Sequence, residues 1–164
     1  MLDRLRSHRA RRGAIVVLAA FLIVAMLGMI TFAIDVGVMV LLKTELQVAA
    51  DSAAMAAAAV LGGENADPVG TAQEFAAYHR AGGKAVSLTS ADVENGTWDS
   101  DARSFTPATT ISNAIRVTAK RNASTGGNKL FFSRIFGVDQ TSVQAQAVAM
   151  GNPRDICFVV DLSG

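Results

Sequence analysis

The sequence predicts an α+β protein: a long N-terminal helix followed by a small, mostly antiparallel sheet with short helices. Two observations support this. An uncharged apolar run at 14–34 continues without proline through an alanine-rich stretch to residue 61. Residues 113–121 and 141–150 then alternate apolar and polar side chains with a period of two. Because a helix of roughly 48 residues is about 70 Å long, we expect a lollipop with the helix as its stem.

The first apolar run has the length and the flanks of a membrane anchor. Its roughly 21 residues give about 31 Å of helix, which matches the hydrocarbon core of a bilayer. The cytoplasmic arm, residues 1–13, carries five arginines and one acid, and positive charge marks the cytoplasmic side. A cleavable signal peptide has a shorter apolar region with a small-residue cleavage site close behind it. We therefore expect an uncleaved transmembrane helix at 14–34, with the N-terminus inside.

Residues 35–61 are expected to continue the helix outside the membrane. Asp35 falls where the apolar run ends, and there it either sets the depth of the helix or contacts a partner helix. Small residues at a spacing of four let helix backbones approach closely: Ala33, Gly37, Ala49, Ala53 and Ala57. The high helix propensity of alanine explains the same residues without a partner. The sequence leaves open whether this stretch packs on its own sheet or on neighbouring helices.

Residues 62–152 form the expected outer α+β domain. We expect a short helix at 71–81, and strands at 86–88, 93–98, 103–105, 113–121 and 141–150. Asn95-Gly96 has the composition of a hairpin turn. His79 has no cysteine or carboxylate cluster at metal-ligand spacing, so we expect it on a helix flank. An aromatic stripe is expected to pack on the sheet as a helix or turn: Phe131, Phe132, Ile135 and Phe136.

The last stretch, residues 153–164, holds an apolar run of the buried-strand type that leads into Asp161-Leu-Ser163-Gly164. Two oxygen-bearing side chains two residues apart suit a hard cation such as Mg²⁺. Cys157 is the single cysteine, so it forms no internal disulfide and is expected to be a small buried side chain. The net charge of +1 gives no argument for a nucleic-acid partner. No convincing nucleophile triad, paired-His spacing or phosphate loop predicts an enzyme.

Several motifs resemble the N-terminal region of TadE/TadG-like Flp (tight-adherence) pilus assembly proteins. They are Arg11-Arg12-Gly13-Ala14, Ala33-Ile-Asp35-Val-Gly37, Glu45-Leu-Gln47 with Ala-Ala-Asp51-Ser-Ala-Ala, Asn113-Ala-Ile-Arg-Val-Thr, Phe131-Phe132 through Phe136-Gly137, and Val143-Gln-Ala-Gln-Ala-Val-Ala. The resemblance implies a non-enzymatic, membrane-anchored component of bacterial Flp pilus assembly or surface adhesion. It implies the inner membrane as location, with the C-terminal domain in the periplasm. The implied partners are the lipid bilayer and other pilus assembly proteins.

TadG-type members of this family carry a von Willebrand factor A domain after this region, and its first strand ends in Asp-x-Ser-Gly-Ser. Asp161-Leu-Ser163-Gly164 resembles the start of that motif. By this resemblance, Asp161 and Ser163 would hold Mg²⁺ only in a protein with the complete domain, and no cofactor is otherwise expected. The alternative function is the anchor and stalk of a metal-dependent adhesin. Pilin-like relatives are cut after a glycine that has a glutamate five residues beyond it, whereas Leu18 follows Gly13 at that spacing, which favours an uncut helix.

Overall fold

The computed structural model describes residues 4–108, 112–122 and 142–151 and the single positions 125, 130, 134 and 137, with side chains of the first helix described from Gly13 on. By its internal contacts the chain divides into two units. The helix unit is Met1–Leu41 with Asn122–Ser142, and the sheet unit is Leu42–Arg121 with Val143–Gly164. The first helix contributes residues to both units.

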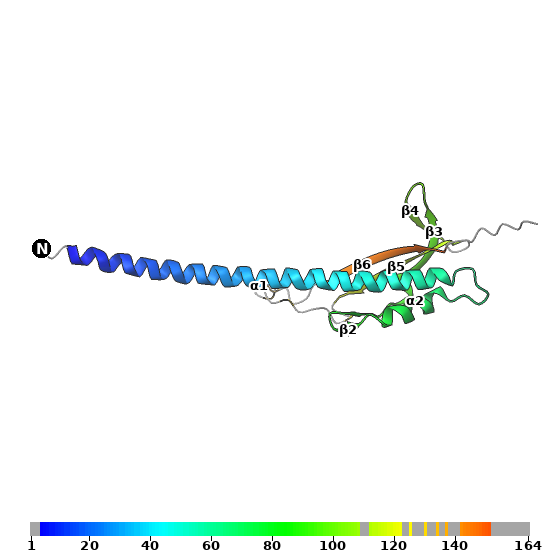
Figure 1. The fold of residues 1–164 in the computed structure, drawn as a ribbon, viewed down its shortest axis with the longest axis horizontal. Helices are drawn as coiled ribbons and strands as arrows, with labels where there is room; N and C mark the ends of the chain where they lie inside the picture. The colour runs from blue at the N-terminus through cyan, green and yellow to red at the C-terminus, as the bar shows by residue number, and fades with distance from the viewer. Residues whose placement is uncertain are drawn as a thin grey trace, which may run out of the picture. The chain divides into compact units, whose positions relative to one another are not determined.

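The helix α1 (Arg4–Ala59) runs unbroken for 56 residues (Figure 1). At 1.5 Å per residue this is about 84 Å of helix. The prediction of one continuous helix through the apolar and alanine-rich stretches is confirmed, although α1 begins earlier than expected and ends at Ala59 rather than Leu61. Beyond Ala59 the backbone turns, and Gly62 has a φ of 81°, which glycine adopts without a Cβ penalty.

Four strands form one antiparallel sheet in the order β4–β3–β5–β6. They are β3 (Val93–Asp99), β4 (Ser104–Pro107), β5 (Ala114–Arg121) and β6 (Val143–Met150). A separate two-stranded hairpin pairs β1 (Arg80–Ala81) with β2 (Lys84–Ala85), and α2 (Pro68–Ala77) is the second α-helix. The predicted α+β class is confirmed.

The two strands with the clearest alternation are confirmed at nearly the predicted bounds. In β5 the side chains of Ile115, Val117 and Ala119 are fully buried, while the residues between them are half-buried. In β6, Ala145 and Ala147 are buried between exposed glutamines. One face of the sheet therefore belongs to the core, as the period of two predicts.

The predicted short helix is confirmed as α2 with different bounds, and one predicted strand near it is wrong. The helix expected at 71–81 begins earlier, because the Asp67 side chain caps it by accepting a 2.9 Å hydrogen bond from the Gly70 N–H, with Pro68 in its first turn. It also ends earlier, at Ala77, because the chain turns into β1. The strand expected at 86–88 is absent: Val86 and Leu88 are buried in extended chain outside the sheet ladder.

The prediction of a turn at Asn95-Gly96 is also wrong. Both residues lie inside β3, where Gly96 pairs with Ala114 on one side and Pro107 on the other. A Cβ on Gly96 would collide with the ring of Phe105 and with the Thr106 carbonyl. The glycine therefore permits a close cross-strand approach. The hairpin turn follows β3 instead, at the Asp-Ser-Asp sequence 99–101, where Asp99 Oδ1 accepts from two backbone N–H groups at 2.9 and 3.0 Å.

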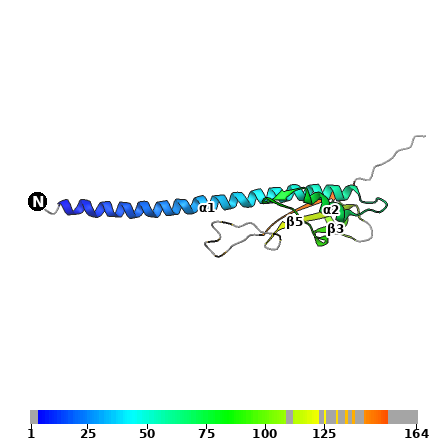
Figure 2. The same ribbon diagram turned by 90° about the horizontal axis from the view of Figure 1, so that it is seen from below.

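The core of the sheet unit lies where α1, α2 and the apolar face of the sheet meet (Figures 1 and 2). The contribution of α1 is one face at helical spacing, and it consists of Leu42, Leu46, Ala49, Ala50, Ala53, Ala54, Ala57 and Ala58, each at most 4% exposed. From α2 come Ala72 and Ala76, both fully buried. Most of these side chains are single methyl groups, and they share one apolar core with the inward-facing residues of the sheet.

The opposite face of the sheet is covered by polar pairs between strands and turns. Arg116 Nε contacts Glu94 Oε2 at 2.6 Å, and Lys120 Nζ contacts Asp92 Oδ1 at 2.5 Å. Asp92 is only 4% exposed. Burial by itself would raise the pKa of its carboxyl, but hydrogen bonds from Lys120 and Thr89 outweigh burial and hold that pKa below its usual value. Asp92 is therefore a charged residue that ties the 3₁₀ turn η1 (Ser90–Asp92) to β5.

We predict that Ala53→Leu destabilises the sheet unit by about 1–3 kcal/mol, because three extra carbons must enter a close-packed core. Ala53 is fully buried. The matched control is Ala59→Leu at the exposed end of the same helix, which should change stability little. Urea unfolding of the full chain in detergent, followed by circular dichroism, measures both. Equal unfolding midpoints for the two variants would contradict the packing of this face.

Candidate functional site

The part of α1 in the helix unit presents an extended apolar surface. Between Ile15 and Ile34 the large apolar side chains are 49–73% exposed. Within the described residues, Gly13–Ala59 is the one helical stretch long and apolar enough to cross a membrane, and a signal sequence near an N-terminus shares these properties. Because each large apolar side chain removed from water gains about 1.5–3 kcal/mol, this surface favours an apolar surrounding.

Asp35 differs sharply in exposure from its neighbours on α1. It is 2% exposed, whereas Ile34 and Val36 on either side are 49% and 38% exposed. It also interacts within its own chain. The carboxylate at the end of the apolar run is therefore covered by this protein itself.

The five small residues singled out for helix packing fall into two groups. Ala49, Ala53 and Ala57 are fully buried in the core of the sheet unit. Of the two options that the sequence left open, these three pack with their own sheet. Ala33 and Gly37 are exposed, and a Cβ built on Gly37 meets no atom within 4 Å. The structure therefore separates a core-forming group from an exposed pair.

A buried arginine holds the β1–β2 hairpin in place. Arg121 is 3% exposed, and its Nη2 donates to the carbonyl oxygens of Ala81 and Lys84 at 2.7 and 3.0 Å. From the other side, Glu45 Oε2 on α1 accepts from the Gly82 N–H at 2.7 Å. Glu45 and Arg121 therefore both hold the hairpin beside α1.

A glutamine from α1 reaches the edge of the sheet. Gln47 Nε2 donates to the Gln146 carbonyl on β6 at 3.1 Å, and also to Asp51 Oδ1 at 2.9 Å. β6 is an edge strand, so its outward carbonyls need partners. Gln47 supplies one of them and sets the position of α1 along β6.

Sequence reasoning missed the roles of Arg121 and Gln47. For Arg121 the alternation along β5 did give a signal, because Arg121 occupies the next inward-facing position after Ile115, Val117 and Ala119. A charged residue at an inward position predicts a buried polar partner. No sequence signal identifies the partner of Gln47, because it lies about a hundred residues away on β6.

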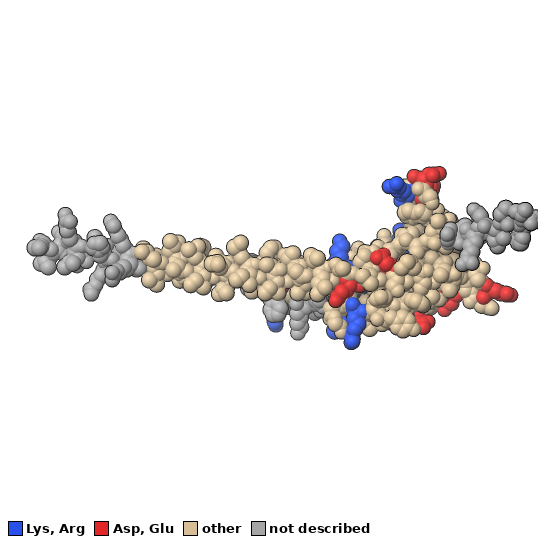
Figure 3. Space-filling model, viewed as in Figure 1, with Lys and Arg blue, Asp and Glu red and all other residues tan. Residues whose placement is uncertain are grey.

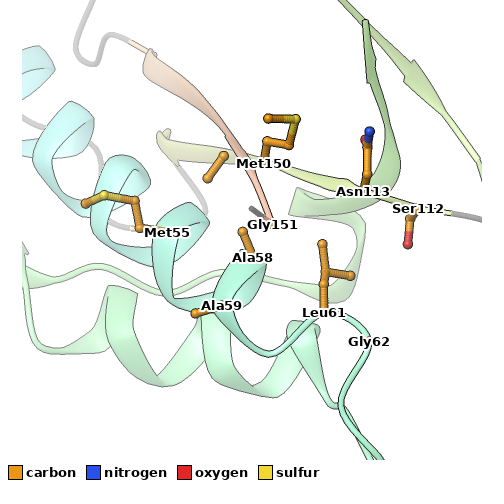
Figure 4. Close-up of a pocket in the computed structure, with 10 residues that line it drawn as sticks. Met55, Ala58, Ala59, Leu61, Gly62, Ser112, Asn113, Met150 and Gly151 are labelled. Atoms are coloured by element: carbon orange, nitrogen blue, oxygen red, sulfur yellow. The ribbon is translucent and has the colours of Figure 1, made fainter. Parts of the chain in front are cut away.

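A shallow groove of about 660 Å³ opens between the end of α1, the start of β5 and the end of β6 (Figure 4). It is lined by Met55, Ala58, Ala59, Leu61, Gly62, Ser112, Asn113, Ala149, Met150 and Gly151. The Asn113 side chain is already engaged, because its Oδ1 accepts from the Trp98 N–H at 2.7 Å. None of these lining residues has a titratable side chain, so they provide apolar contact rather than acid–base chemistry.

Several predicted residues lie outside the described part of the chain. These are Asp161 and Ser163 of the metal motif, Cys157, and the aromatic stripe of Phe131, Phe132, Ile135 and Phe136. His79 is described: it is half-buried just after α2, and its backbone N–H donates to the Ala76 carbonyl at 3.0 Å. Within the described residues no three His, Cys, Asp or Glu side chains gather in a metal-binding group.

Comparison with known proteins assigns the family. The model of the Tad-like Flp pilus-assembly family matches residues 48–149, which span most of the sheet unit. The model of the Flp pilus-assembly TadE/G-like family matches residues 13–60, which lie almost entirely in α1. Neither the curated proteins nor the solved structures gave a match. Because the first of these family models covers more than half of the sequence, the chain belongs to the Tad-like Flp pilus-assembly family.

Proposed function

We propose that this Flp pilus-assembly protein is a non-enzymatic component anchored in the bacterial inner membrane by α1. The observation that carries the proposal is the exposed apolar surface of α1 up to Ile34, on a helix whose last residues are built into a folded core. Lipid offers that surface an apolar surrounding, and the helix satisfies its own backbone groups there. The same helix then presents the sheet unit to other pilus assembly proteins.

The test of anchoring places two charges within the proposed span. In the variant Ile23→Arg with Leu27→Arg, both replaced side chains are 58% exposed and lie on one face of α1. Each arginine at a membrane centre costs about 2.5–3.5 kcal/mol. We expect the wild-type chain to stay in membranes washed with alkaline carbonate, and the variant to be largely extracted.

The matched control places two arginines on the same helix outside the proposed span. Val48 and Met55 are 51% and 63% exposed, so Val48→Arg with Met55→Arg should leave the chain in the carbonate-resistant fraction. Extraction of the wild-type protein, or equal extraction of the two variants, would overturn the anchoring role.

We also propose that the N-terminus is cytoplasmic, that the sheet unit is periplasmic and that α1 is retained uncut. The arginines that precede the apolar run support this orientation. Protease added to spheroplasts should remove a C-terminal tag while an N-terminal tag stays protected on the membrane-bound chain. A protected C-terminal tag would reverse the orientation, and loss of the N-terminal tag from the mature chain would show that α1 acts as a signal sequence.

We propose, finally, that Ala33 and Gly37 contact α-helices of other pilus assembly proteins. Both are exposed small residues, and the open space at Gly37 lets a second backbone approach α1. Since Ala49, Ala53 and Ala57 are already buried in their own core, a substitution there perturbs this chain and cannot report on a partner.

The test is Gly37→Leu, at a position where an added Cβ meets nothing within 4 Å. We expect it to reduce site-specific crosslinking between α1 and partner helices at least several-fold, without release from the membrane. The control is Gly13→Leu, which is also unobstructed and should leave crosslinking unchanged. Equal crosslinking in Gly37→Leu and wild type would exclude this contact.

The alternative, the anchor and stalk of a metal-dependent von Willebrand factor A adhesin, rests on Asp161-Leu-Ser163-Gly164 alone. In that case Asp161 and Ser163 would be ligands of Mg²⁺ in a complete domain. A reading frame that continues beyond Gly164 with a second serine and a full α/β domain would favour it over the pilus-assembly role. A frame that ends there would exclude it.

A further inference from the structure

We propose that one end of the sheet unit contacts anionic phospholipid headgroups at the membrane surface through Lys43, Arg80 and Lys84. This inference rests on the proposed membrane anchoring by α1 and adds a specific lipid chemistry to it. We call these three residues the basic end.

The position of the basic end is set by the bonds of the β1–β2 hairpin. Gly82 donates to Glu45 on α1, and Arg121 donates to the carbonyls of Ala81 and Lys84. Arg80 and Lys84 therefore belong to a hairpin held at the level of Glu45 along α1. They are not on a free loop, so their charges keep one position relative to the helix.

Lys43 lies at nearly the same level on a different side of α1. It precedes Glu45 by two residues, which is about 3 Å along the axis and more than half a turn around it. Because Glu45 faces the hairpin, Lys43 points away from it. Figure 3 shows Lys and Arg on both sides of α1 at this end of the sheet unit. The cations thus flank the helix.

All three cations are exposed. Within the described residues none of them forms an ion pair, whereas Arg116 and Lys120 on the sheet are paired with carboxylates. Among the described residues, Glu45 accepts a hydrogen bond from the hairpin and Arg121 donates to its carbonyls, so the charge around the hairpin stays positive. Positive charge at this level is therefore not neutralised by the protein itself.

Acidic side chains gather at the opposite end of the sheet unit. Glu64 and Asp67 are exposed in the loop after α1. The helix segment from Lys43 to Ala59 separates the two ends by about 24 Å. This charge separation orients the unit, because a negative surface attracts the basic end and repels the acidic one.

The apolar surface of α1 leads directly to the basic end. Val40 and Leu41 are 61% and 59% exposed, and Lys43 is the next charged residue along the helix. Lys43 lies about 13 Å along α1 beyond Ile34, where the proposed span ends, and long basic side chains can bridge part of that distance to a headgroup phosphate. Continuity with the proposed anchor therefore identifies the negative partner as a phospholipid headgroup.

The test follows amide hydrogen exchange of the β1–β2 hairpin in the full chain, reconstituted in phosphatidylcholine vesicles with and without phosphatidylglycerol. Since each cation near an anionic surface strengthens attraction roughly fivefold, we expect hairpin exchange to slow several-fold when phosphatidylglycerol is present. High salt and the variant Arg80→Gln with Lys84→Gln should abolish the difference. The N-terminal arginines are present in every sample, and amide exchange in the hairpin does not measure their contacts with lipid.

The control variant is Arg103→Gln, which removes an exposed cation from the turn after β3 and should retain the lipid effect. Inorganic phosphate added to phosphatidylcholine vesicles should not slow amide exchange in the hairpin. If phosphate alone slows it, the basic end binds free anions and not lipid headgroups. Equal exchange in the two vesicle types, or protection retained by the double variant, overturns the inference. A chain that floats with neither vesicle type refutes the anchoring role instead, so the two failures are distinguishable.

Discussion

The close contact between an alanine face of α1 and one face of the antiparallel sheet is the interaction on which the sheet unit depends. Ala49, Ala53 and Ala57 are fully buried in the core of that unit, and beside them Gln47 reaches the Gln146 carbonyl and Glu45 reaches the hairpin. Larger side chains would separate these polar partners. The same alanines therefore provide the apolar packing and allow these polar side chains of α1 to reach backbone groups of the sheet and the hairpin.

The helix α1 has two kinds of surface along its length. Up to Ile34 its large side chains are exposed, which favours lipid, whereas from Leu42 on one face is buried by protein. Asp35 lies between these stretches and is covered within the chain. A carboxylate exposed to hydrocarbon would cost several kcal/mol, so its cover is consistent with a position near the end of a membrane span.

The buried charged side chains Arg121 and Asp92 both have polar partners. Arg121 donates to hairpin carbonyls, and Asp92 joins Lys120 to the turn before β3. Removing one member of such a set leaves a buried group without its partner, and this lowers the stability of the fold by more than the hydrogen bond itself contributes. These residues fix the positions of short elements, and the hairpin that they hold carries two of the cations at the basic end.

The sequence by itself determined the α+β class, the unbroken α1 and the strands β5 and β6, because hydrophobic period and helix propensity act locally and are strong there. It also carried the motifs of the family. Tertiary structure decided that Gly96 allows a cross-strand contact inside β3, since the ring of Phe105 comes from another strand. It also decided that Ala49, Ala53 and Ala57 pack on their own sheet while Ala33 and Gly37 remain exposed. Alanine forms helices in either setting, so only contacts with residues distant in sequence could separate the two groups.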